Sequence, residues 1–155
     1  MAQPSLNLED AYEACRKETA QWAKTFYLGT MLLPPAKRRA IWAIYVWCRR
    51  TDELMDSIEA QKKSRNELSD RLNQWEDKTK NIFAGNTQDD LDAVLADTLQ
   101  KFPQSIQPYI DMIERSYLTI ELARSYLNDT SRPSDAHGLP PTRLYCSVAI
   151  VILYP

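Results

Sequence analysis

Glycine is scarce in this sequence, which has three glycines against nine prolines among 155 residues. Sheets joined by tight hairpins draw on glycine for their turns, so this scarcity disfavours an all-β chain. Proline has no backbone N–H and clashes with the preceding helical turn, so it ends helices. The balance therefore predicts an all-α chain whose helices are separated by proline-containing turns.

Three features of other functional classes are also missing. The formal net charge is −2, so there is no basic excess of the kind that nucleic-acid binding requires, and we expect no nucleic-acid partner. The three cysteines form no CxxC pair and no cluster with the single histidine, which disfavours a zinc site. No apolar run approaches the roughly 18 residues of a membrane-spanning helix.

Apolar residues at steps of three and four predict five helices. The first has Asn7 as its N-cap and runs to about Leu28, with Trp22 and Phe26 on its apolar face. The second begins at Pro35, where the missing N–H is not needed, and runs to about residue 57. The others cover about 66–83, about 89–102, and about 107 to at least 114. Residues 147–155 are β-branched and predict a strand or a buried end.

One face of the second predicted helix combines apolar and charged residues. Its members follow one another at steps of four, four, three and four, which places them on one stripe: Ile41, Tyr45, Arg49, Asp52 and Asp56. Two carboxylates one turn apart repel each other unless a cation lies between them. Their hard oxygen atoms suit Mg²⁺, which takes one or two carboxylates together with substrate phosphates. The alternative is an acidic pair on a solvated helix face.

Arg49 lies one turn before this carboxylate pair, and its planar guanidinium could hold a diphosphate. The predicted chemistry is metal-assisted departure of a diphosphate beside apolar walls suited to a hydrophobic substrate. Glu53 lies off the stripe, and we expect it at the surface or behind the site. Trp42 and Trp47 are expected to be packing residues of the helix.

The segment KTFYLGTMLLPPAKRRAIWAIYVWCRRTDELMD, residues 24–56, closely resembles the phytoene synthase branch of the squalene/phytoene synthase family. The segments LDAVLADTLQKFP at 91–103 and IQPYIDMIE at 106–114 are similar to later parts of the same family. The resemblance covers roughly residues 8–114. It implies that residues 1–114 form the N-terminal part of the helical isoprenoid synthase fold.

This resemblance implies a prenyltransferase that condenses two geranylgeranyl diphosphates head to head, through prephytoene diphosphate, to phytoene in carotenoid biosynthesis. It implies Mg²⁺ or Mn²⁺ as cofactor, with Asp52 and Asp56 as the catalytic, metal-binding carboxylates. The substrate-binding positions would fall on Arg49, Thr25, Phe26 and Tyr45. A C20 tail makes peripheral membrane contact reasonable. The start of the sequence has no signal-like or transit-like character, so we expect a bacterial-type chain, cytoplasmic or at a membrane surface, or a plastid protein whose address lies outside this sequence.

The sequence departs from the family after Glu114. It contains no second DxxxD motif, and residues 115–155 are predicted to be a divergent tail, from a truncated or frame-shifted gene. We therefore expect no phytoene from this chain alone. Two alternatives stay open. One is a squalene or dehydrosqualene synthase using shorter prenyl chains, and the other is an inactive helical module that binds a partner or a prenyl lipid.

Overall fold

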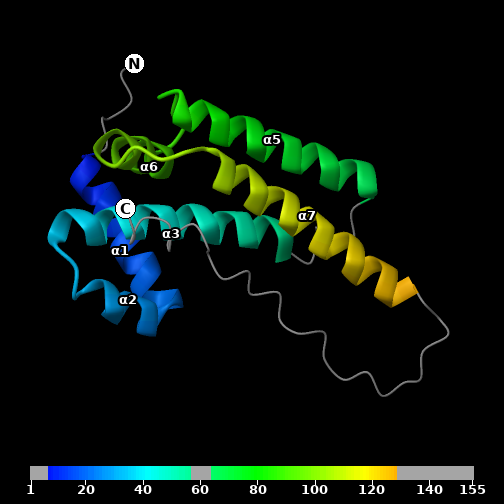
Figure 1. Cartoon of the computed structure of the whole chain (residues 1–155), viewed down its shortest axis with the longest axis horizontal. Helices are drawn as coiled ribbons and strands as arrows, with labels where there is room; N and C mark the ends of the chain where they lie inside the picture. Colours follow the sequence, from blue (N-terminus) through cyan, green and yellow to red (C-terminus); the bar gives the residue numbers. More distant parts are fainter. Residues whose placement is uncertain (1–6, 57–63, 129–155) are drawn as a thin grey trace.

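The computed structural model describes residues 7–56 and 64–128, and every regular element in these ranges is a helix (Figure 1). The helices, in chain order, are α1 Leu8–Trp22, α2 Lys24–Thr30, α3 Pro35–Asp56, α5 Arg65–Phe83, α6 Asp90–Lys101 and α7 Gln107–Asn128. The predicted all-α class is therefore confirmed. The segment 147–155, for which a strand or buried end was predicted, lies outside the described residues.

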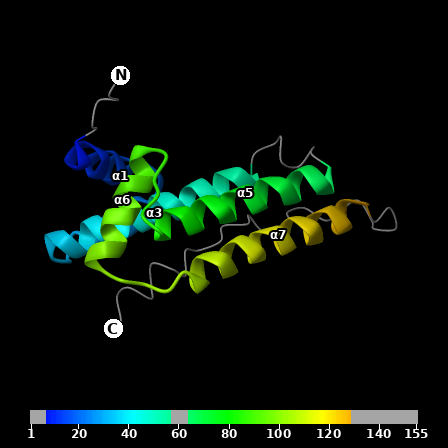
Figure 2. The ribbon, with the colours of Figure 1, turned by 90° about the horizontal axis from the view of Figure 1, so that it is seen from above.

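Helix α3 occupies the middle of the arrangement. It contacts α1 and α6, which also contact each other, and it contacts α7. Helix α5 contacts α6 and α7. Figure 2 shows α3, α5 and α7 running roughly alongside one another, with α1 and α6 gathered at one end of this layer. The position of a side chain on α3 therefore decides which neighbouring helix it faces.

The prediction of one helix from residue 8 to about Leu28 is wrong in one respect, because the chain breaks at Ala23. This residue has φ −139° and ψ 64°, which ends α1, while its N–H still reaches the Thr19 carbonyl. The break lets α2 turn a different face to α3. There the Trp42 Nε1–H donates to Thr30 Oγ1 at 2.9 Å, and the rings of Tyr27 and Trp42 stack at 5.8 Å.

The other helices begin and end as local rules predict. Asn7 accepts a hydrogen bond from the Glu9 N–H, as an N-cap should, and Asp89 does the same for the Asp92 N–H at the start of α6. Ser64 and Glu67 form a reciprocal capping box at the start of α5. Gly85 follows α5 with φ +86°, a left-handed conformation that favours glycine. These four helix ends show that much of the chain's division into helices is encoded locally.

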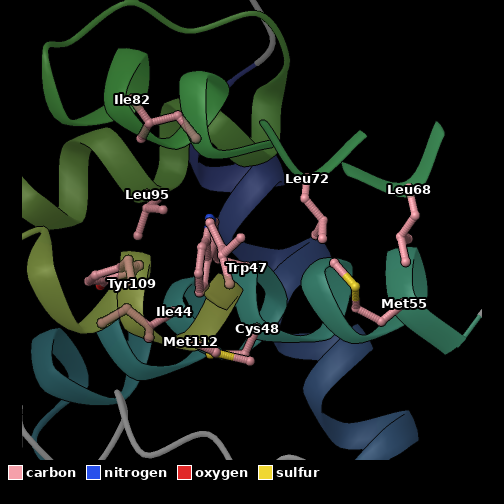
Figure 3. Close-up of a cluster of buried hydrophobic side chains, with 11 residues drawn as sticks. Ile44, Trp47, Cys48, Met55, Leu68, Leu72, Ile82, Leu95, Tyr109 and Met112 are labelled. Carbon is pink, nitrogen blue, oxygen red and sulfur yellow. The ribbon is translucent and has the colours of Figure 1, made fainter. Parts of the chain in front are cut away.

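The main hydrophobic core lies between α3, α5, α6 and α7, and Trp47 is at its centre (Figure 3). Trp47 is 2% exposed, and its ring stacks on Trp75 and meets the edge of Tyr109 at 4.8 Å. Its Nε1–H donates to Thr79 Oγ1 at 3.2 Å, so the indole is buried without an unsatisfied donor. A second cluster joins α1 to α3 through Tyr12, Cys15, Trp42, Val46 and their neighbours. The prediction that Trp42 and Trp47 are packing residues is confirmed.

Replacing Trp47 by Ala should lower the free energy of unfolding by about 3–5 kcal/mol, because it empties the centre of the core. The matched change Trp22→Ala removes an indole that is 52% exposed and should cost less than about 1 kcal/mol. Denaturant titration followed by far-ultraviolet circular dichroism measures both. Equal losses for the two variants would contradict this description of the core.

Candidate functional site

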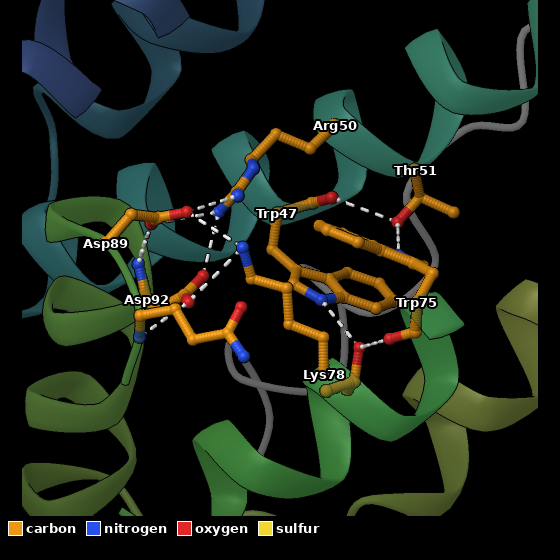
Figure 4. A network of polar contacts seen from close by, with 9 residues as sticks. Trp47, Arg50, Thr51, Trp75, Lys78, Asp89 and Asp92 are labelled. Carbon is orange, nitrogen blue, oxygen red and sulfur yellow. Dashed lines mark hydrogen bonds and ion pairs between the residues drawn. The ribbon is translucent and has the colours of Figure 1, made fainter. Parts of the chain in front are cut away.

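Arg49 and Arg50 are adjacent on α3 but contact different helices. Successive residues of an α-helix point about 100° apart, so two neighbouring arginines cannot face the same partner helix. Arg50 faces α5 and α6, where it joins a network of ion pairs (Figure 4). Arg49 contacts Trp22, the last residue of α1. Arg50 is therefore a structural residue, and Arg49 is a candidate binding residue.

The Arg50 network connects three helices. Arg50 donates from Nη1 to Asp92 Oδ1 at 3.0 Å and from Nη2 to Asp89 Oδ2 at 2.8 Å. Lys78 of α5 bonds Asp89 Oδ2 at 2.8 Å and lies 3.4 Å from Asp92 Oδ2. The Asp92 carboxylate is fully buried and also accepts the Gln88 N–H. Both nitrogens at the end of the guanidinium are thus occupied by carboxylates.

The electrostatics of this network favour the ionised form of Asp89. Burial alone would raise the pKa of Asp89, but hydrogen bonds from Lys78 and the Asp92 N–H, together with Arg50, outweigh it and lower that pKa well below its usual range. The Arg50 guanidinium also lies over the Trp75 ring at 5.1 Å. The acidic residues at the start of α6 are visible in the sequence, but their partner Arg50 is not predictable from it, since Arg50 lies some forty positions away.

On the opposite side, Arg49 has two close neighbours. Its Nε lies 3.1 Å from Glu53 Oε1, one helical turn further on, and its guanidinium carbon lies 4.2 Å from the centre of the Trp22 ring. Glu53 is exposed, as predicted, but its ion pair with Arg49 was not foreseen. Trp22 was expected to pack inward on the first helix, and it is instead half exposed beneath the arginine.

An aromatic pair lies on the same side of α3 as Arg49, one turn nearer the start of the helix. The rings of Phe26, from α2, and Tyr45, from α3, lie 5.6 Å apart between centres. Tyr45 precedes Arg49 by one helical turn. The contacts Trp22–Arg49 and Phe26–Tyr45 therefore join α3 to the α1–α2 segment at two successive turns of α3. The structure thus brings together three of the four predicted substrate-binding residues. Thr25 is exposed on α2, and among the described residues no hydrogen bond involves its hydroxyl.

The two predicted metal ligands lie at the last turns of α3. Asp52 is half buried on the helix, and Asp56 is its final residue, for which only the backbone is described. Within residues 7–56 and 64–128 there is no group of three or more His, Cys, Asp or Glu side chains that could hold a metal ion. The donor chemistry still fits Mg²⁺, because this ion uses only one or two protein carboxylates and takes its remaining ligands from water and phosphates. Asp52 and Asp56 are the residues that would hold it.

Exposed apolar side chains concentrate in one segment of the described chain. Five large ones fall within eleven consecutive positions at the end of α1, in α2 and in the turn that follows: Trp22, Phe26, Leu28, Met31 and Leu32. Helix α7 exposes two more, Leu118 and Leu122. Gathered apolar exposure of this kind marks a surface that receives a ligand or further protein. Among the described helices, none is long and apolar enough to cross a membrane.

Asp92→Asn tests the structural role of the Arg50 network. The change keeps the size of the side chain but removes the buried charge that Arg50 and Lys78 face, and should cost about 2–4 kcal/mol of unfolding free energy. Asp90, exposed in the same first turn of α6, is the matched control, and Asp90→Asn should cost less than about 1 kcal/mol. Denaturant titration at neutral pH compares them. An Asp92→Asn variant as stable as the control would show that the network does not hold the helices together.

Comparison with known proteins identifies the family of this chain. Residues 19–133 match the squalene/phytoene synthase family, so the match continues past Glu114, which itself lies inside the unbroken helix α7. The chain is 58% identical over 112 residues to the 15-cis-phytoene synthase of Synechocystis sp., covering 72% of this chain and 32% of that protein. It is 48% identical over 117 residues to the chloroplastic phytoene synthase of Narcissus pseudonarcissus, covering 76% and 27%.

A solved structure shares the fold. A crystal structure of a dehydrosqualene synthase in complex with a ligand matches 77% of this chain and 40% of its own, with a TM-score of 0.62 and 24% identity. The chain spans about a third of the length of the curated relatives it matches. The residues that match the family, 19–133, include α2, α3 with its RRTDELMD segment, α5, α6 and α7. The chain belongs to the squalene/phytoene synthase family, in its phytoene synthase branch.

Proposed function

We propose that this chain carries the first metal- and diphosphate-binding part of a prenyltransferase that condenses two geranylgeranyl diphosphates head to head to phytoene. The observation that carries the proposal is the arrangement on α3. Arg49 contacts Trp22 and Tyr45 contacts Phe26, so a cation and an aromatic wall occupy one side of the helix. Asp52 follows Arg49 on the same stripe by helical spacing. A charged head group and an apolar tail would each find a suitable surface.

In this proposal Arg49 binds the diphosphate through its guanidinium N–H groups, and Asp52 with Asp56 supplies oxygen ligands for Mg²⁺ or Mn²⁺. When bound, the divalent cation neutralises charge that builds up on the departing diphosphate. Phe26 and Tyr45 contact the prenyl chain and keep water from the allylic carbon, which protects the carbocation from hydrolysis. In this proposal the hydroxyl of Thr25, exposed on α2 just before Phe26, donates a hydrogen bond to a phosphate oxygen.

The proposed reaction has two stages. The carbon–oxygen bond of one substrate breaks, its electron pair leaves with the diphosphate, and the double bond of the second substrate attacks the allylic cation. Loss of a proton closes the three-membered ring of prephytoene diphosphate. This intermediate then loses its own diphosphate, the resulting cation rearranges, and loss of a second proton gives phytoene. An apolar wall next to a cationic diphosphate site serves both stages, because each starts by separating charge in a site that excludes water.

The substrate also bears on where the chain would act. A C20 prenyl tail partitions into lipid, and exposed apolar residues such as Leu28, Met31 and Leu32 are suited to a membrane surface. We therefore include peripheral membrane contact in the proposal, in a bacterial cytoplasm or, if an address lies outside this sequence, in a plastid. Shorter prenyl diphosphates remain the substrate alternative, since chain length depends on the depth of the complete cavity.

Asp52→Asn should weaken Mg²⁺-dependent binding of geranylgeranyl diphosphate at least about tenfold, since it removes a charged oxygen ligand. Asp77→Asn, at an exposed carboxylate of α5, is the matched control and should leave binding unchanged. Isothermal titration with and without Mg²⁺ measures both. Binding that ignores Mg²⁺, or that survives Asp52→Asn intact, would contradict the assigned metal role.

The same protein is then assayed for product. Analysis of the extracted lipids for phytoene separates an active enzyme from a helical module that binds a prenyl diphosphate without reacting. Farnesyl diphosphate in a parallel reaction tests the shorter-chain alternative. We expect no phytoene from this chain alone. Phytoene that disappears in Asp52→Asn but not in Asp77→Asn would show that the chain is itself an active enzyme.

A further inference from the structure

Arg49 is held by two residues to which no role has been assigned so far. Trp22 lies under the face of its guanidinium, and Glu53 bonds one of its edges. We propose that Trp22 is a positioning residue that orients Arg49 toward a diphosphate, and that Glu53 is the group this diphosphate displaces. The inference rests on the proposed function, because it takes Arg49 to be the diphosphate contact.

The location of Trp22 favours a role in positioning over one in packing. It is the last residue of α1, immediately before the break at Ala23, and half of its surface is exposed although it is the bulkiest side chain type. It belongs to neither of the two buried hydrophobic clusters. An arginine over an indole face is attracted by the electron-rich ring, and this contact leaves the donors at the guanidinium edge free for an anion.

Glu53 occupies only part of the Arg49 edge. Its carboxylate reaches Nε, and among the described residues no hydrogen bond involves Nη1 or Nη2 of Arg49. Arginine carries five N–H donors, so most remain available. Glu53 is more than half exposed, and exposed ion pairs contribute little stability. A diphosphate carries more charge and more oxygens than one carboxylate, so it would outcompete Glu53 at this edge.

Arg50 shows the contrasting arrangement within the same helix. It also lies over an indole, that of Trp75, but its two Nη atoms are already bonded to Asp89 and Asp92. Each of its terminal nitrogens is therefore already engaged by a carboxylate. An aromatic platform with unfilled donors, found at Arg49, is the combination that suits capture of an anion.

A double-mutant cycle on inorganic pyrophosphate binding tests the proposal, using isothermal titration at a fixed Mg²⁺ concentration. Trp22→Ala should weaken binding about three- to tenfold, whereas Trp22→Tyr, which keeps an aromatic face, should restore most of the affinity. In an Arg49→Gln background, Trp22→Ala should have no further effect, because it acts only through the arginine. Glu53→Gln should tighten binding, about two- to fivefold, since it removes the competing charge.

Leu32→Ala, at an apolar side chain that is 89% exposed, is the control for nonspecific surface effects and should bind as the parent does. Circular dichroism verifies that each variant is folded. Additive losses from Trp22→Ala and Arg49→Gln, or weaker binding in Glu53→Gln, would overturn this inference while leaving the proposed function standing. Failure of the parent chain to bind pyrophosphate, with Arg49→Gln equally inert, would overturn both.

Discussion

The ion pair between Arg50 and the buried carboxylate of Asp92 is the interaction on which the rest of the structure depends. It joins α3 to α6, and Lys78 extends it to α5. A buried carboxylate without a partner costs several kcal/mol, so the pair allows essentially one rotation of α3 about its own axis. With Arg50 fixed on that side, Arg49 must emerge about 100° away, where it meets Trp22.

One helix thereby serves the core and the candidate site at once. Trp47 and Ile44 of α3 are buried against α5, α6 and α7, whereas Tyr45, Arg49 and Asp52 line the other side and are only partly buried. Of these, Arg49 keeps its two terminal nitrogens without a hydrogen bond among the described residues. The rigid packing on the core side holds these groups in fixed positions, which is the usual requirement for a site that must stabilise separated charge.

Helix positions and the family were predictable from sequence because their signals are local. Periodic apolar residues, the N-caps Asn7 and Asp89 and the stop at Gly85 each act within a few positions. The break at Ala23 was not predictable, because periodicity continues across it and only packing against Trp42 of α3 favours the turn. The partners of Arg50 and the exposure of Trp22 depend on contacts between distant segments, which periodicity does not contain. The pairing of Asp52 with Asp56 as metal ligands remains a prediction.

The most direct measurement of the division between the two arginines is a nitrogen–proton correlation spectrum of the arginine Nε–H groups, recorded before and after adding pyrophosphate with Mg²⁺. Arg49→Lys and Arg50→Lys variants identify the two signals. The account predicts that the Arg49 signal shifts, because the diphosphate replaces the hydrogen bond from Arg49 to Glu53. The Arg50 signal should not shift, because Arg50 keeps its hydrogen bonds to Asp89 and Asp92. A shift of the Arg50 signal with Arg49 unchanged would contradict the account.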